Sequence, residues 1–67
     1  MRDPIYWDDV YAIALMLRRV YPRVAPLRAS DGDLRRWVIA LDGFADNPAG
    51  GAPELLDDIR AEWIELS

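Results

Sequence analysis

The chain has 67 residues, no cysteine, no histidine and a formal net charge of −4. These facts exclude disulfides, structural zinc, cluster ligation by thiolates and histidine-based acid–base catalysis. The length predicts one domain, residues 1–67, that is stabilised by packing alone. No apolar run reaches the length of a signal-peptide core or a membrane span, so we expect a cytoplasmic protein.

Positive and negative residues are unevenly distributed along the chain. Residues 1–36 hold seven arginines and five aspartates, whereas residues 37–67 hold one arginine and seven acidic residues, and lysine is absent. The acidic second part favours a basic protein surface or a cation as partner and disfavours nucleic acid. The alternative is that these acids only form a solvated face, as in many small proteins.

The first predicted element is an amphipathic helix that ends before Pro22. Acidic residues (Asp8, Asp9) precede it and basic residues (Arg18, Arg19) occupy its last turn, which complements the helix dipole. Pro22 stops the helix because proline cannot donate the next backbone hydrogen bond. The apolar residues that recur with helical spacing are Val10, Ile13, Ala14, Leu17, Val20 and Tyr21.

A proline-containing linker over residues 22–30 leads to the second predicted helix, which begins near Ser30. Ser30 and Asp31 are alternative N-caps, and the spacing from Ser30 to Asp33 is that of a capping box. Leu34, Trp37, Val38 and Leu41 form the predicted buried stripe, with Arg35 and Arg36 on the solvent side. Gly43 is the expected C-terminal stop.

A loop over residues 43–52 contains one aromatic residue, Phe44, which we expect to fold back onto the core. Pro53 suits the first position of the third predicted helix. Its core-facing residues are Leu55, Leu56, Ile59, Trp63 and Leu66. The predicted fold is therefore all-α, a small three-helix bundle, and a strand or wing in residues 23–30 would make it a winged-helix-like variant. One buried cluster is expected from Trp7, Leu17, Tyr21, Trp37, Leu41, Phe44, Ile59 and Trp63.

Aromatic, proline and apolar landmarks follow one another in a fixed order through the chain. They are Trp7-Asp8-Asp9, Ile13-Ala14 with Leu17, Tyr21-Pro22, Asp33-Leu34, Trp37-Val38, Leu41 with Phe44, Asp46-Asn47-Pro48, Leu55-Leu56, Ile59 and Trp63. This ordered set resembles the IscX family of iron–sulphur cluster assembly accessory proteins. One departure is the loop after Phe44, where the family has an unbroken run of aspartates and this chain has Ala45-Asp46-Asn47-Pro48.

The resemblance implies a regulatory adaptor, not an enzyme, that binds a cysteine desulfurase on a basic surface and binds ferrous iron weakly through carboxylates. No other cofactor is expected, and the protein is expected to be a monomer. A helical chain of this size also offers little concave pocket for catalysis. Two alternatives use an Arg-rich face instead: a nucleic-acid-associated module, or a divergent paralogue with another partner. That face would consist of Arg18, Arg19, Arg23, Arg28, Arg35 and Arg36.

The candidate partner-binding residues are the acids of the second part of the chain. Glu54, Asp58 and Glu62 follow one another at intervals of four and therefore share one helix face. The full set is Asp42, Asp46, Glu54, Asp57, Asp58, Glu62 and Glu65. The candidate ligands for ferrous iron are Asp9, Asp33, Asp42 and Asp46, because oxygen ligands would have to replace the missing histidine and cysteine.

Overall fold

The protein is described by a computed structural model, which places residues 3–67. Three α-helices follow one another along the chain: α1 (Val10–Val20), α2 (Asp31–Ile39) and α3 (Pro53–Leu66). Two short 3₁₀ helices, η1 (Pro26–Arg28) and η2 (Pro48–Gly50), lie in the connections between them. No strand is formed within residues 3–67, so the predicted all-α class is confirmed.

The helices begin and end largely where the sequence predicts. Ser30 is the N-cap of α2, because its backbone is extended and its hydroxyl accepts a 3.0 Å hydrogen bond from the Asp33 amide. Pro53 occupies the first position of α3, and Tyr21 caps α1 immediately before Pro22. The helix α2 ends at Ile39, earlier than the predicted stop at Gly43. Gly43 serves the following turn instead, with a φ of 93° that favours glycine.

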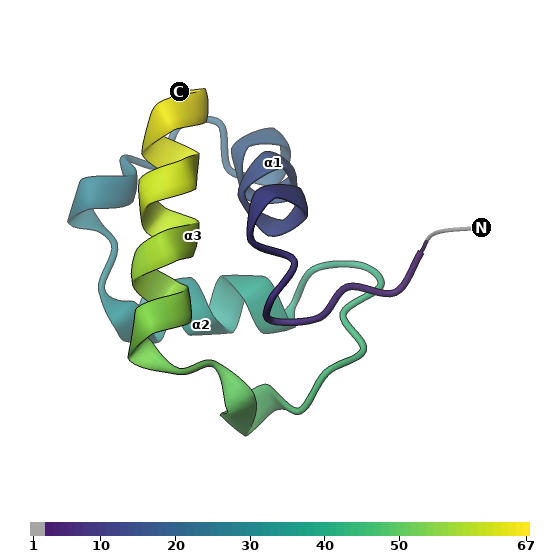
Figure 1. Cartoon of the computed structure of the whole chain (residues 1–67). Coiled ribbons are helices and arrows are strands. Elements are labelled where there is room, and N and C mark those ends of the chain that lie inside the picture. The colour runs from purple at the N-terminus through teal and green to yellow at the C-terminus, as the bar shows by residue number, and fades with distance from the viewer. Residues whose placement is uncertain (1–2) are drawn as a thin grey trace.

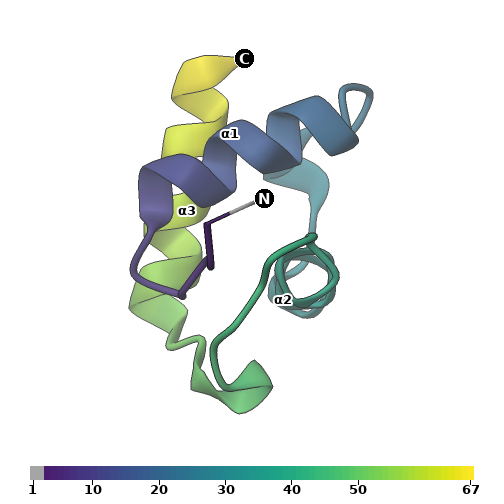
Figure 2. The ribbon, with the colours of Figure 1, turned by 90° about the vertical axis from the view of Figure 1, so that its right-hand side faces the viewer.

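The three helices cross one another and do not run side by side. Figure 1 shows α3 upright, with α2 lying across its lower end. Figure 2 shows α1 passing across the upper half of α3, with α2 viewed nearly along its axis. The most extensive contact joins α1 to α3. The linker over residues 23–30 contains only η1, so the predicted wing is not seen among the described residues.

The core lies where the inner faces of the three helices meet. Its buried residues are Ile5, Trp7, Ile13, Ala14, Leu17, Leu34, Val38, Leu41, Leu56, Ile59 and Trp63. Tyr21, Trp37 and Phe44 are half-buried and pack against this core. The Trp37 ring lies between those of Tyr21 and Trp63, with centroid distances of 5.1 and 6.2 Å. The predicted cluster is therefore confirmed for its five buried members, whereas Tyr21, Trp37 and Phe44 are only half-buried at its edge.

The N-terminal segment before α1 completes the core by pairing with the loop after α2. The Ile5 amide donates to the Gly43 carbonyl at 2.9 Å, and the Ala45 amide donates to the Ile5 carbonyl at 2.9 Å. The Trp7 indole N–H then donates to the Asn47 carbonyl at 2.7 Å. Because of these bonds, the loop over residues 43–52 is held against the N-terminal segment (Figure 2).

Two expectations about the surface were wrong. Val20 belongs to the predicted buried stripe of α1, but it is 54% exposed, because it borders a hollow beside α1 that no other element fills. Arg35 was assigned to the solvent side of α2, but it is half-buried. Its guanidinium donates to the Gly51 carbonyl at 2.6 Å and lies over the Trp7 ring, 5.8 Å from its centroid. The loop before α3 covers this side of α2 and converts a surface position into a packed one.

Candidate functional site

The outer side of α3 carries most of the acidic residues that the sequence singles out. Leu56, Ile59 and Trp63 are buried against the core, so the 3.6-residue period directs the intervening positions toward solvent. Glu54, Asp57, Asp58 and Glu65 are exposed there, and Glu62 is half-buried at the flank. We call these five residues the acidic face of α3.

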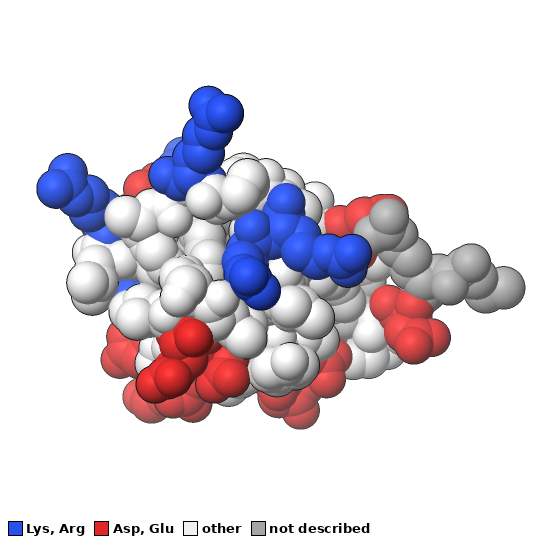
Figure 3. All heavy atoms as spheres, turned by 90° about the horizontal axis from the view of Figure 1, so that it is seen from above, with Lys and Arg blue, Asp and Glu red and all other residues white. Residues whose placement is uncertain are grey.

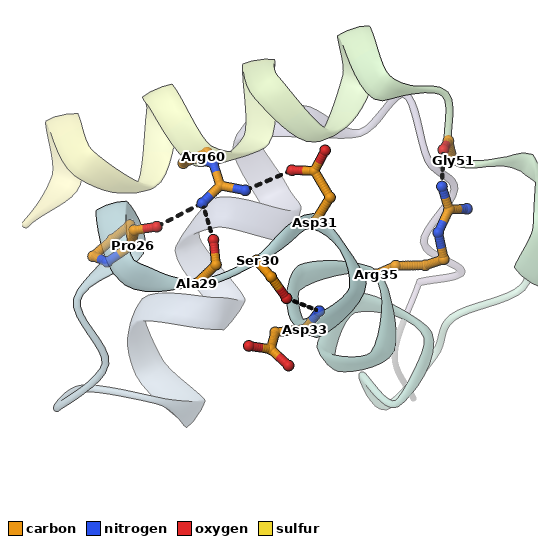
Figure 4. Close-up of polar contacts among 8 residues, drawn as sticks. All are labelled: Pro26, Ala29, Ser30, Asp31, Asp33, Arg35, Gly51 and Arg60. Atoms are coloured by element: carbon orange, nitrogen blue, oxygen red, sulfur yellow. Dashed lines mark hydrogen bonds and ion pairs between the residues drawn. The ribbon is translucent and has the colours of Figure 1, made fainter.

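The acidic face of α3 is not neutralised by neighbouring arginines. No ion pair involving its five carboxylates occurs within residues 3–67. Arg60, the sole basic residue of α3, is directed toward η1 and the start of α2 (Figure 4). Its guanidinium donates to the carbonyls of Pro26, at 2.8 Å, and Ala29, and to the Asp31 carboxylate at 2.7 Å. The charged groups on the solvent side of the helix are therefore all negative.

Asp46 has a structural role and lies apart from this face. Its carboxylate accepts hydrogen bonds from the Trp7 amide at 3.0 Å and from the Asn47 amide at 2.7 Å. These two bonds, the one from Trp7 foremost, hold the pKa of Asp46 below its ordinary value. The carboxylate thereby fastens the N-terminal segment to the loop after α2.

Asp42 also lies away from the acidic face of α3. It is exposed in the turn after α2, and it borders a hollow of about 690 Å³ between the N-terminal segment and α1. Asp3 and Asp9 line the same hollow. The seven predicted partner-binding acids are thus divided: five lie on α3, Asp42 lies beside α1, and Asp46 is a structural anchor.

The four candidate iron ligands are not brought together. Asp33 pairs with Arg36 on α2, and Asp46 accepts the two amide hydrogen bonds described above. Asp9 accepts a 2.8 Å hydrogen bond from the Tyr6 amide, and of the four candidates only Asp9 and Asp42 border the same hollow. In the part of the chain that the structure describes, no three histidine, cysteine or acidic side chains are close enough to hold a metal ion.

The comparison with known proteins agrees with the landmarks that the structure places in its core. Residues 5–67 match the family described as iron-sulphur cluster assembly. The chain belongs to the IscX family. An uncharacterized protein of Pseudomonas aeruginosa is 42% identical over 59 residues, which cover 88% of this chain and 89% of the relative. The match spans the N-terminal segment, all three helices and the loops between them.

In this IscX-family chain, the loop between Phe44 and Pro53 contains a single carboxylate, and that carboxylate stabilises the fold. Asp46 is the sole acid between Phe44 and Pro53, and both of its carboxylate oxygens accept backbone amides. The loop is therefore a poor source of exposed negative charge. The acids of α3 are the ones that remain available to a partner.

Sequence reasoning missed two arginines, Arg35 and Arg60, that bind carbonyl groups and connect elements far apart in the chain (Figure 4). The available signal was the position of Arg60 as the one cation within an acidic helix. None of the helices that the structure describes is long and apolar enough to span a membrane.

Proposed function

We propose that this chain is a non-catalytic accessory protein of iron–sulphur cluster assembly that docks on a cysteine desulfurase in the cytoplasm. Docking occurs through the acidic face of α3, which contacts a basic surface of the enzyme and thereby regulates sulphur delivery. The observation that carries the proposal is the absence of any ion pair on this face within residues 3–67, although Arg60 lies on the same helix. Membership of a cluster-assembly family supports the choice of process.

The chemistry of the face fits electrostatic docking better than catalysis or metal binding. Exposed carboxylates on one helix face raise the rate of encounter with a basic surface and suppress association with acidic ones. Like charges at intervals of three and four residues slightly destabilise α3, so the arrangement costs stability that a basic partner restores. A resident metal ion is not part of the proposal, because the candidate ligands lie on different elements.

The decisive experiment measures the association rate with a purified cysteine desulfurase at increasing salt concentrations. The test variant is Asp58→Lys with Glu65→Lys, two exposed positions on the acidic face of α3. The matched control is Asp3→Lys with Asp8→Lys, which changes the net charge equally on the N-terminal segment. Exposed charges are screened beyond about 10 Å at 0.1 M salt, so association of the unaltered chain should slow steeply as salt increases.

We expect the α3 variant to associate at least about tenfold more slowly at low salt, while the control changes the rate by less than about threefold. An equal effect of both variants would show that net charge alone governs binding, and a rate independent of salt would exclude electrostatic docking. Lysozyme, a basic protein unrelated to cluster assembly, serves as a specificity control. Equally fast binding to lysozyme would contradict the choice of a desulfurase.

A further inference from the structure

Three exposed arginines gather where α1 ends. Arg18 and Arg19 lie in its last turn, and Arg23 follows Pro22. Among residues 3–67, none of the three makes an ion pair or a hydrogen bond to a side chain or carbonyl. Figure 3 shows arginines over the upper and central parts of this view, and acids along its lower edge and to the right of its centre. We call Arg18, Arg19 and Arg23 the arginine corner.

The arginine corner adjoins a hollow that polar and apolar residues line together. Arg18 and Arg19 line this hollow together with Pro22, Val24, Trp63 and Ser67, and its volume is about 640 Å³. Trp63 faces the core whereas Glu65 faces solvent, so the hollow and the acidic face of α3 lie on different sides of that helix. A ligand in the hollow would meet guanidinium groups at its edge and the side chains of Pro22 and Val24 beside them.

A structural role accounts for two of the three arginines of the corner and not for the third. The helix dipole favours cations in the last turn of α1, which explains Arg18 and Arg19. It does not explain Arg23, which lies beyond the helix and is exposed. The basic residues of this chain are all arginines, and the planar guanidinium binds a carboxylate through two parallel hydrogen bonds. The corner is therefore suited to carboxylate recognition.

We propose that the arginine corner is a second docking surface, which binds an acidic segment of a partner protein. The carboxylates of the segment pair with the guanidinium groups, and an apolar side chain between them enters the hollow. Because the acidic face of α3 stays exposed, the chain can bridge a basic protein and an acidic one. This inference concerns a different surface from the one through which we propose desulfurase docking, and it does not depend on that proposal.

An acidic protein segment fits the corner better than nucleic acid does. The molecule measures 27 × 25 × 16 Å and has a net charge of −4. On a molecule of this size, a long polyanion would extend from the corner toward the α3 carboxylates, which repel it over a screening length of about 10 Å at 0.1 M salt. A short acidic segment contacts the corner alone. Pro22 and Val24 also offer no benefit to a phosphate backbone, which binds chiefly by charge.

Fluorescence anisotropy with a short fluorescein-labelled polyglutamate peptide at low salt tests the proposal. The test variant is Arg18→Gln with Arg23→Gln, and the matched control is Arg28→Gln with Arg36→Gln, which removes the same charge from exposed arginines outside the arginine corner. We expect the dissociation constant of the test variant for the peptide to rise at least about tenfold, because the variant loses two charge-assisted contacts. The dissociation constant of the control for the peptide should stay within about twofold of that of the unaltered chain, because exposed surface charges contribute little.

Each other outcome overturns the proposal. Equal losses in both variants, or no peptide binding at all, would show that the corner has no specific site. Tighter binding of a single-stranded oligonucleotide of equal charge, lost in the test variant, would assign the corner to nucleic acid. Sedimentation showing self-association that the test variant abolishes would assign it to the acidic face of a second copy.

Two further measurements keep the result interpretable. Far-ultraviolet circular dichroism establishes that each variant is folded, and the single change Arg23→Gln, outside any helix, replaces the double variant if the latter unfolds. Peptide binding by the Asp58→Lys, Glu65→Lys variant should equal or exceed that of the unaltered chain. A loss of peptide binding in that variant would contradict two separate surfaces. The experiment contains no desulfurase, so its outcome is independent of the proposed function.

Discussion

The indole ring of Trp7 lies so close to Gly51 that a Cβ at position 51 would stand 2.9 Å from three of the ring carbons. The Gly51 carbonyl meanwhile accepts a hydrogen bond from Arg35, whose guanidinium lies over the same ring. The tryptophan is thus enclosed by the loop before α3 and by α2. This contact fixes the position from which α3 begins.

Gly51→Ala should destabilise the protein by about 1–3 kcal/mol, because the added methyl group overlaps the Trp7 ring. The backbone of Gly51, with φ −72° and ψ 93°, is not in the left-handed region, so the effect is steric. Gly32→Ala in α2 is the control, since its nearest neighbour would be 3.8 Å away and alanine favours a helix by about 0.5–1 kcal/mol. Urea denaturation should move the two variants in opposite directions.

Arg60→Met should destabilise the protein by about 1–3 kcal/mol, because two carbonyls and the Asp31 carboxylate lose their donor. The side chain of Arg60 is only 16% exposed, so water replaces those bonds poorly. Arg36→Met is the matched control: Arg36 pairs with Asp33 at the surface, and such a pair contributes less than about 1 kcal/mol. Equal losses of stability would contradict the role of Arg60 as a link between α3, η1 and α2.

The stability contributed by Asp46 should depend on pH. Two backbone amides lower the pKa of Asp46, so the folded state favours the ionised carboxylate. This contribution is fully present above the ordinary carboxyl pKa of about 4 and is lost as the pH falls through the lowered pKa. The unaltered chain should exceed Asp46→Asn in free energy of unfolding at pH 7. A difference that stays constant down to pH values well below about 4 would contradict this assignment.

Phe44→Ala should lower the free energy of unfolding by about 2–3 kcal/mol, less than the loss of about 3–5 kcal/mol that is typical of a fully buried phenylalanine. Phe44 is half-buried, and its ring meets that of Trp7 edge-on with a centroid distance of 5.3 Å. Phe44→Leu retains much of the buried surface and should cost less. The two denaturation midpoints separate apolar burial from the ring contact, and a negligible effect of Phe44→Ala would place this residue outside the core.

Anaerobic calorimetric titration with ferrous iron should give at most weak binding without stoichiometric saturation. The four candidate carboxylates lie on separate elements, and no group of three acids converges within residues 3–67. If a small heat of binding is measured, the double variant Asp9→Asn with Asp42→Asn should reduce this heat more than Asp33→Asn with Asp46→Asn does, because Asp9 and Asp42 border one hollow. Tight binding at one iron per chain would contradict this expectation.

Much of the fold could be predicted from local chemistry. Ser30 caps α2 because its hydroxyl reaches an amide three residues away, and Pro53 starts α3 because the first turn needs no donor there. The apolar period placed Leu17, Ile59 and Trp63 in the core. It failed at Val20, since periodicity does not show which edge of an apolar stripe the neighbouring elements leave uncovered.

The division of charged residues into structural and exposed ones was decided by the tertiary structure. The sequence alone determined the helices, the inner faces and the excess of acids in the second part of the chain. It could not show that Arg35, Asp46 and Arg60 bind groups 16, 39 and about 30 residues away, leaving the acids of α3 unpaired. The physical reason is that a charged side chain is compatible with solvent or with a polar partner, and only the packing of helices and loops determines which of them it meets.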